Sequence, residues 1–341
     1  MSEMKSYIEG TTEKILKVLS TKEQRERFEE GEWNVPLWQA IQEAGLTLLS
    51  IDEEKGGVGG DYEDVFAILR IVGKYAAPIP LAEVIYANQF IANHEGEVEP
   101  KLRVVHFENG SEEELKYVPF ARYADEVIVI STEGYKVVNL ALNEISSNKE
   151  NIAAEPRDTV KVIQRLENRK LNTTSEEALE DYTNFLALSR VAMMAGAMES
   201  VLALSIFYSK ERQQFGRSLY KFQAIQQHLT VMAGETAAAN ATLAVTSATY
   251  QTDVGKEQIA MAKIELSANA NLVAKAAHQL HAGIGMTYEH ELHHFTRRLW
   301  AWREEGGNET YWADQLATMY LAREETIWES ITQVKGAEVH V

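Results

Sequence analysis

The C-terminal half of the chain carries the feature that most constrains the fold, a helical pattern that continues from about residue 173 almost to the end. The first segment begins at Thr173 or Thr174, each followed three residues later by a glutamate, which is the spacing of a capping box. Two further long, Ala-rich segments follow, and the second ends at Gly283, a residue type that often terminates helices. Long helices joined by short turns predict a helical bundle over residues 171–341.

Two smaller domains are predicted before this bundle, over residues 1–98 and 99–170. In the first, "VPLWQAIQEAGL" and "DYEDVFAILRIVGKY" have helical periodicity, with Asp61 as an N-cap, and a third helix is expected over residues 81–93. In the second, "ADEVIVISTEGYKVVNLAL" predicts a hairpin and "DTVKVIQRL" a further strand. The predicted fold class is mainly α with a small, shortened β-domain between an N-terminal helical domain and a C-terminal four-helix-type bundle.

Composition limits the partners of this chain of 341 residues. Lys and Arg total 33 and Asp and Glu total 51, giving a formal net charge of −18, which repels nucleic acid and anionic membranes. There is no cysteine, so disulfides, thiolate catalysis and Cys-ligated metal sites are excluded. The N-terminus "MSEMKSYIEG" lacks the apolar core of a signal peptide. We expect a cytoplasmic protein with no nucleic acid and no membrane among its partners.

One short motif matches a metal-site pattern. The residues "HELHH" fit H-E-x-x-H through His290, Glu291 and His294, which on a helix would chelate zinc and activate water. The alternative interpretation is a His-rich helix start after a glycine turn. The stretch "KGGVGG" does not fit a phosphate-binding loop and is interpreted as a turn between helices.

Three separated segments together resemble the acyl-CoA dehydrogenase family, in the order in which that family carries them. "LWQAIQEAGLTLLSIDEEKGGVGGDYEDVFAILRIVGKYAAPIPLAE" is similar to its N-terminal helical segment. "ERQQFGRSLYKFQAIQQHLTVMA" resembles its R-x-x-F-G…F-Q signature, and "QLHAGIGMTYEHELHHFTRRL" resembles its Q-x-x-G-G-x-G segment, with Ala282 in place of the first glycine of the pair. The resemblance covers about residues 33–95 and 185–312.

This resemblance implies that FAD is the cofactor and that one subunit's bundle holds the adenosine diphosphate part of an FAD lying mainly on its neighbour. By motif, Arg212 would pair with the pyrophosphate, for which the guanidinium fork is well shaped. Phe215 and Gln223 would line the adenosine side, and Gln279 and Gly283 would contact it from the next turn.

The implied reaction is α,β-dehydrogenation of an acyl-CoA thioester, with a Glu base whose pKa desolvation raises and hydride transfer to flavin N5. In the commonest branch of the family, the position of the catalytic base corresponds to Gly306 of this chain. Glu305 is one residue away, and we nominate it as the base. A minor branch places it near Leu186, which is apolar. The family's T-E-P-x-A-G-S-like segment, which binds the flavin ring, has no counterpart between residues 101 and 170.

With no glutamate at the aligned base positions and no flavin-ring segment, the chain resembles the short subunit type of heteromeric bacterial acyl-CoA dehydrogenases. Three hypotheses follow: an FAD-dependent dehydrogenase subunit working with a related chain, a non-catalytic subunit that completes the FAD site or supports the complex, and a zinc hydrolase using HELHH. The expected partners are an acyl-CoA from fatty acid or steroid side-chain degradation, a related subunit or further copies of this chain in a dimer or tetramer, and an electron-accepting protein.

Overall fold

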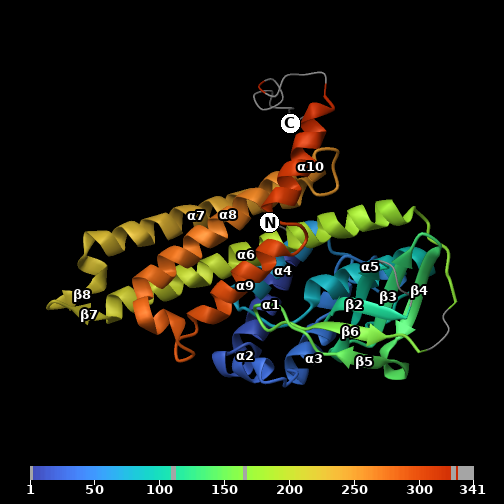
Figure 1. Cartoon of the computed structure of the whole chain (residues 1–341), viewed down its shortest axis with the longest axis horizontal. Helices are drawn as coiled ribbons and strands as arrows, with labels where there is room; N and C mark the ends of the chain where they lie inside the picture. Colours follow the sequence, from blue (N-terminus) through green and yellow to red (C-terminus); the bar gives the residue numbers. More distant parts are fainter. Residues whose placement is uncertain (1–2, 109–112, 164–166, 324–327, 329–341) are drawn as a thin grey trace.

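Helices α1 to α5 form the N-terminal part of the molecule, and the computed structural model describes residues 3–108, 113–163, 167–323 and 328 (Figure 1). Asp61 caps α4 as predicted: its side chain accepts from the N–H of Asp64, whose own side chain accepts from the N–H of Asp61. The expected third helix is α5, which extends two residues beyond the prediction. The helices are α1 (Glu3–Leu19), α2 (Lys22–Glu29), α3 (Val35–Glu43), α4 (Tyr62–Lys74) and α5 (Leu81–Glu95).

Strands β1 to β6 follow and form two three-stranded sheets, with orders β1-β3-β4 and β2-β6-β5. The predicted hairpin is confirmed as β3–β4, which pair antiparallel from Glu126 opposite Asn139 to Ser131 opposite Gly134. β1 joins β3 in parallel, and the other sheet is antiparallel. The strands are β1 (Arg103–Phe107), β2 (Glu114–Pro119), β3 (Glu126–Ser131), β4 (Gly134–Asn139), β5 (Glu144–Ser147) and β6 (Arg157–Lys161).

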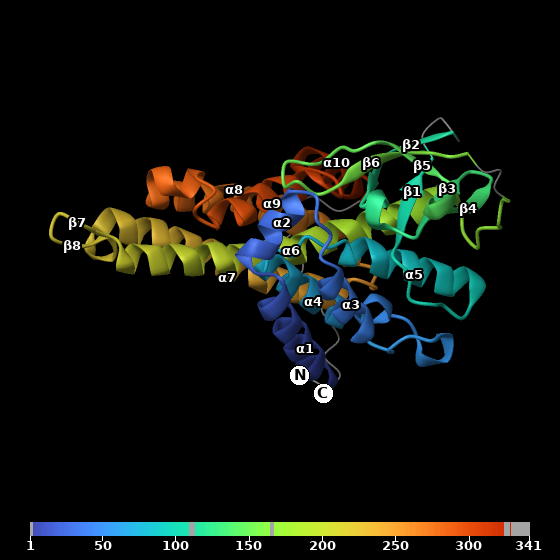
Figure 2. The same ribbon diagram turned by 90° about the horizontal axis from the view of Figure 1, so that it is seen from below.

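The C-terminal bundle begins with α6, capped by Thr174 and Glu177 in the predicted capping box. Figures 1 and 2 show α6, α7 and α8 running side by side, with the small hairpin β7–β8 at the end far from the sheets. The predicted fold class is confirmed, while the residue boundaries given for the domains stay a prediction. The elements are α6 (Ser175–Glu211), β7 (Gln213–Gln214), β8 (Arg217–Ser218), α7 (Gln223–Thr249), α8 (Gly255–His281), the 3₁₀ helix η6 (Ala282–Met286), α9 (Leu292–Glu304) and α10 (Glu309–Leu321).

Two glycines allow the N-terminal part to pack closely on the bundle. A Cβ added to Gly73 of α4 would lie 1.9 Å from the carbonyl oxygen of Met193, and one added to Gly196 of α6 would lie 1.8 Å from that of Arg70. Both distances are far below van der Waals contact, so α4 and α6 approach each other through backbone. Buried apolar side chains of α4 and α6 belong to the same hydrophobic core.

Helix α6 is also long and apolar enough, by length and composition, to cross a membrane. Within the molecule it packs against several other helices, and more than half of its most apolar stretch is buried. A core helix of a folded domain has the same composition, so this property carries no argument for a membrane location.

Candidate functional site

A cavity of about 420 Å³ lies at the end of the bundle that carries the β7–β8 hairpin. Three of the five residues predicted to bind FAD line it together: Arg212, Gln279 and Gly283. Arg212 directly follows α6, Gln279 lies in the last turn of α8, and Gly283 lies in η6. The fold therefore brings the two quoted sequence signatures to one place.

The donors around this cavity suit an anionic phosphate group. Arg212 is exposed, and its guanidinium makes no hydrogen bond or ion pair with another part of the chain that the structure describes. Ile225, in the first turn of α7, also lines the cavity, so the positive end of that helix lies near it. A Cβ on Gly283 would meet nothing within 4 Å, so its backbone is open to a second molecule. A diphosphate such as that of FAD fits these residues.

The other two predicted FAD residues lie outside the cavity wall, at the same end of the bundle. Phe215 is at the turn of the β7–β8 hairpin, is 90% exposed, and contacts Phe222 with a ring-centroid distance of 6.1 Å. Gln223 is the exposed first residue of α7. Their contact with an adenosine group stays a prediction.

Helix α8 ends at His281 and not at Gly283 as expected, because the backbone turns at Ala282, with φ 52° and ψ −137°. This is a conformation that L-residues rarely adopt and that glycine tolerates. We expect Ala282→Gly to raise the free energy of unfolding by about 1 kcal/mol in urea denaturation. Ala268→Gly, at an exposed position within α8, is the control and should lower it by about 1 kcal/mol. Equal losses for both variants would contradict strain at Ala282.

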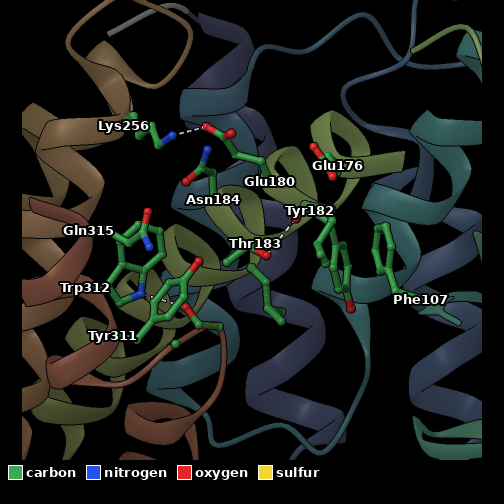
Figure 3. A pocket seen from close by; sticks show the side chains of 14 residues that line it. Phe107, Glu176, Glu180, Tyr182, Thr183, Asn184, Lys256, Tyr311, Trp312 and Gln315 are labelled. Carbon is green, nitrogen blue, oxygen red and sulfur yellow. Dashed lines mark hydrogen bonds and ion pairs between the residues drawn. The ribbon is translucent and has the colours of Figure 1, made fainter. Parts of the chain in front are cut away.

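A second cavity, of about 490 Å³, lies between the start of α6 and α10 (Figure 3). Leu186 and Gly306, the positions where the family resemblance places a base, both line it. Neither residue has a carboxylate. Much of the remaining wall is apolar or aromatic. Two glutamates of α6 also line it: Glu180, which is paired with Lys256, and Glu176, which lies in the exposed first turn of the helix. The lining includes Phe107, Leu179, Tyr182, Tyr311 and Trp312.

Glu305 is absent from the lining of this cavity, and its carboxylate lies in a largely buried network of charges. Oε1 accepts from Arg157 and, at 2.9 Å, from Nδ2 of Asn151, while Oε2 accepts from Nε of Arg190 at 2.9 Å. Arg190 also pairs with Glu83 of α5, so Glu305 joins three parts of the chain.

We expected burial to raise the pKa of the nominated base, Glu305, and this expectation is wrong. Burial alone would raise the pKa of Glu305, but the charges of Arg157 and Arg190 and the hydrogen bond from Asn151 outweigh burial and lower it to about 2. A carboxylate held in this way is a poor proton acceptor at neutral pH. The catalytic assignment of Glu305 stays a prediction that this geometry does not favour.

Gly306 passes close to the backbone of α6. Its φ is +67°, and a Cβ there would lie 2.9 Å from the backbone nitrogen of Ala187 in α6. The loop therefore needs glycine at this position to pass α6, and a glutamate would not be accommodated there in this conformation.

Lys263 lies beside this network and gives the fold a pH dependence. Its fully buried ammonium donates to the carbonyl oxygens of Trp302 and Arg303 at 2.8 Å each, and burial, assisted by repulsion from Arg190, lowers its pKa to about 7. Because the unfolded chain keeps this proton up to about pH 10.4, Lys263 opposes folding most strongly below pH 7 and progressively less as the pH rises.

We therefore expect the free energy of unfolding to rise by ~2 kcal/mol between pH 7.5 and 9.0, measured by urea denaturation. Lys263→Met should flatten this slope. A slope that persists in the variant would assign the effect to another group.

The HELHH residues do not form the zinc motif of the alternative hypothesis. Helix α9 begins at Leu292, so His290 precedes it and the i, i+4 helical spacing does not apply. Glu291 pairs with Arg25 at 2.6 Å, and His290 packs against His281. Among the described residues, the histidines and carboxylates near enough to share an ion are Glu29, His293 and His294. The geometry therefore gives no support to a zinc hydrolase built on Glu291.

Comparison with known proteins gives consistent matches. Residues 179–321 match the family model of the acyl-CoA dehydrogenase C-terminal domain. The chain is 27% identical over 267 residues to acyl-CoA dehydrogenase IpdE2 of Mycolicibacterium smegmatis, covering 77% of this chain and 80% of the relative.

Solved structures share the fold over nearly the whole chain. A chain of the ChsE4–ChsE5 complex from Mycobacterium tuberculosis superimposes with a TM-score of 0.83 at 17% identity, covering 95% of this chain and 99% of that chain. A variant of the Tcur3481–Tcur3483 steroid ACAD superimposes with a TM-score of 0.79 at 22% identity, covering 93% and 97%.

Proposed function

Because the chain belongs to the acyl-CoA dehydrogenase family, we propose that it is one subunit of a heteromeric, FAD-dependent acyl-CoA dehydrogenase that assembles with a related chain. The reaction is α,β-dehydrogenation of an acyl-CoA thioester from fatty acid or steroid side-chain degradation. The complex is cytoplasmic and passes its electrons to an acceptor protein.

One observation carries this proposal: Arg212, Gln279 and Gly283 line a single cavity at the exposed end of the bundle. FAD, when bound, supplies the hydride acceptor of the reaction. Arg212 neutralises diphosphate charge there with a donor fork that matches phosphate oxygens. The positive end of α7 supports the same charge. Gly283 gives the ligand access to the backbone.

The proton acceptor of the reaction comes from the partner chain in this proposal. Leu186 and Gly306 present no carboxylate to the second cavity, and Glu305 is held by two arginines. The short β-region of two three-stranded sheets carries no T-E-P-x-A-G-S-like segment for a flavin ring, which also argues for a partner.

A second candidate keeps the base in this chain. Glu305 directly precedes Gly306, which lines the second cavity, so a change of the loop would move the carboxylate toward it. That change must first break the ion pairs with Arg157 and Arg190. Because breaking buried ion pairs costs free energy, this candidate is the less favoured one.

The test is reconstitution. The chain is purified alone and after co-expression with each acyl-CoA dehydrogenase-like chain encoded beside it, and flavin absorbance and acyl-CoA-dependent dye reduction are measured with straight, branched and steroid side-chain thioesters. We expect flavin and activity with the pair and neither with the chain alone. Stoichiometric flavin and full activity in the isolated chain would overturn the heteromeric assignment.

A further inference from the structure

We propose that a third cavity, between α5 and the first turns of α6, binds an alkylammonium group, carried either by a small amine or by a lysine side chain of the partner subunit. The cavity has a volume of about 310 Å³ and is lined by residues of α4, α5 and α6. It shares no lining residue with the two cavities described above. The second source of the ligand rests on the heteromeric assembly proposed above, and the first does not.

The described wall of this cavity carries negative charge and no lysine or arginine. Asp181 and Glu177 line it and lie one turn apart on α6. Oδ2 of Asp181 accepts from the hydroxyl of Tyr86 at 3.0 Å, but the carboxylate makes no ion pair within the part of the chain that the structure describes. A cation in the cavity would supply the counter-ion that Asp181 lacks there.

His94 also lines the cavity and is neutral in this arrangement. Its Nδ1 lies 2.8 Å from the carbonyl oxygen of Phe90, and because a carbonyl only accepts, Nδ1 carries the proton. Nε2 accepts from the backbone N–H of Asn172 at 3.3 Å. The histidine therefore does not take the place of a cation.

The cavity removes part of the water from the Asp181 carboxylate. Asp181 is open to solvent on one side, but burial raises the pKa of its carboxyl, with the hydrogen bond from Tyr86 opposing this shift. Burial and, second, the charge of Asp181 raise the pKa of Tyr62 to about 12, so this tyrosine feels the same carboxylate. A partly desolvated carboxylate attracts a cation more strongly than one fully surrounded by water.

Aromatic rings favour an organic cation as the ligand. Tyr62, Tyr86 and Phe90 line the cavity. The first two pack against Phe185, with ring centroids 6.3 and 5.4 Å away, and the third stacks on His94 at 4.1 Å. The rings are thus held in place without a ligand. The faces of such rings attract ammonium groups.

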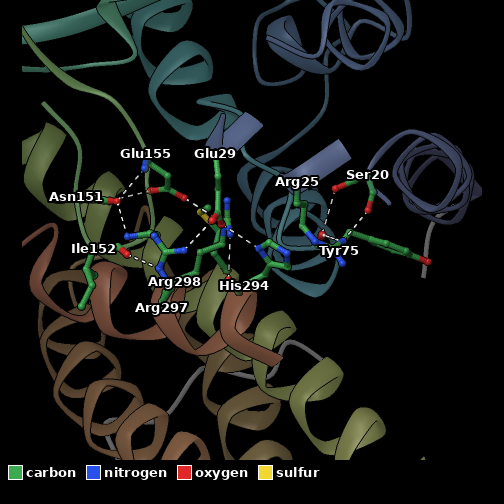
Figure 4. Close-up of polar contacts among 12 residues, drawn as sticks. Ser20, Arg25, Glu29, Tyr75, Asn151, Ile152, Glu155, His294, Arg297 and Arg298 are labelled. Atoms are coloured by element: carbon green, nitrogen blue, oxygen red, sulfur yellow. Dashed lines mark hydrogen bonds and ion pairs between the residues drawn. The ribbon is translucent and has the colours of Figure 1, made fainter. Parts of the chain in front are cut away.

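A metal ion fits this cavity less well. Among the described residues, the histidines and carboxylates close enough to share an ion lie elsewhere, in the cluster of Glu29, His293 and His294. Arg297 pairs with Glu29 there (Figure 4). Asp181 belongs to no such group, so its cavity suits a single positive charge against an aromatic wall.

The test measures binding of choline chloride and butylammonium chloride to the purified full-length chain by calorimetry and thermal unfolding, at an ionic strength fixed with NaCl. Dimethylbutanol, the uncharged carbon isostere of choline, is the control ligand. We expect both ammonium compounds to bind one equivalent with a rise in Tm. Dimethylbutanol should bind at least about tenfold more weakly than choline, a difference of 1.4 kcal/mol or more.

Variants assign the binding to this cavity. Asp181→Asn keeps the shape of the side chain and an acceptor for Tyr86, and it should weaken binding of both ammonium compounds at least about tenfold. Tyr62→Phe keeps the aromatic ring and should change binding less than about twofold, whereas Tyr62→Leu should weaken it about two- to fivefold. Asp314→Asn removes one charge from an exposed position of α10 and should leave binding unchanged.

Titration of the reconstituted pair of chains distinguishes the two sources of the ammonium group. If a free amine is the ligand, the pair binds choline and butylammonium as the single chain does. If a lysine of the partner subunit fills the cavity, the pair no longer binds them, and Asp181→Asn weakens assembly while Asp314→Asn does not.

Three results would overturn the site: no binding of either ammonium compound to the single chain, binding of dimethylbutanol as tight as that of choline, or equal binding by Asp181→Asn and Asp314→Asn. Circular dichroism of each variant separates loss of the site from loss of the fold. These readouts depend on neither flavin nor dehydrogenase activity, so the ammonium site and the proposed function fail or stand separately.

Discussion

Glu305→Gln is expected to lower the free energy of unfolding by about 3 kcal/mol, because it removes the carboxylate that Arg157 and Arg190 share in a largely buried ion-pair network and leaves them with Glu155 and Glu83 as their acidic partners. The variant keeps the size of the side chain and its hydrogen bond from Asn151. It removes the negative charge that Arg157 and Arg190 share, and with it part of the contact between the β-region and α6. Urea denaturation with the midpoint and slope fitted together measures the loss.

Glu304→Gln is the matched control, since Glu304 is the preceding residue and its side chain is 60% exposed. It should change stability by less than about 0.5 kcal/mol. The same pair of variants tests the less favoured base assignment in the assembled complex. An unchanged stability of Glu305→Gln together with complete loss of acyl-CoA dehydrogenation would refute the structural role and restore Glu305 as the base.

Much of the fold was predictable because its signals are local. The capping residues Asp61 and Thr174 are each followed three residues later by an acidic residue, and both helices begin where predicted. The β3–β4 hairpin is local too, with short pairing distances along the chain. The end of α8 was misplaced by two residues, because Ala282 takes a backbone conformation in which a glycine is expected.

The surroundings of Glu305 were not predictable, because they depend on residues far apart in the sequence. Arg157, Arg190 and Glu83 come from a strand and two different helices, and no spacing rule connects them. One signal was present: Arg190 is the lone charge in the apolar run "FLALSRVAMMAGAM", and a buried arginine requires an acidic partner. Arg212, Gln279 and Gly283 each belong to a short motif that the sequence singles out, whereas only the fold shows that they line one cavity. Their binding of FAD stays a prediction.

Arg212→Ala is expected to weaken the retention of FAD by the assembled complex on the order of a hundredfold. Charge-assisted hydrogen bonds to phosphate contribute about 1.5–3 kcal/mol each, and the guanidinium presents two donors in parallel. Folding is expected to be unaffected, because the side chain is exposed and makes no ion pair with the residues described. Equilibrium dialysis of the complex, followed by flavin fluorescence, measures the dissociation constant.

Lys210→Ala separates this local role from a general effect of charge. Lys210 lies two residues away and loses the same unit of charge, but it is absent from the cavity wall and packs over the ring of Tyr220, 5.6 Å from its centroid. If Arg212 pairs with the diphosphate, Lys210→Ala should weaken FAD retention less than about threefold at physiological salt, since exposed charges are screened there. Equal losses in the two variants would mean that the bundle end attracts FAD by net charge alone, and the assignment of Arg212 to the diphosphate would then be abandoned.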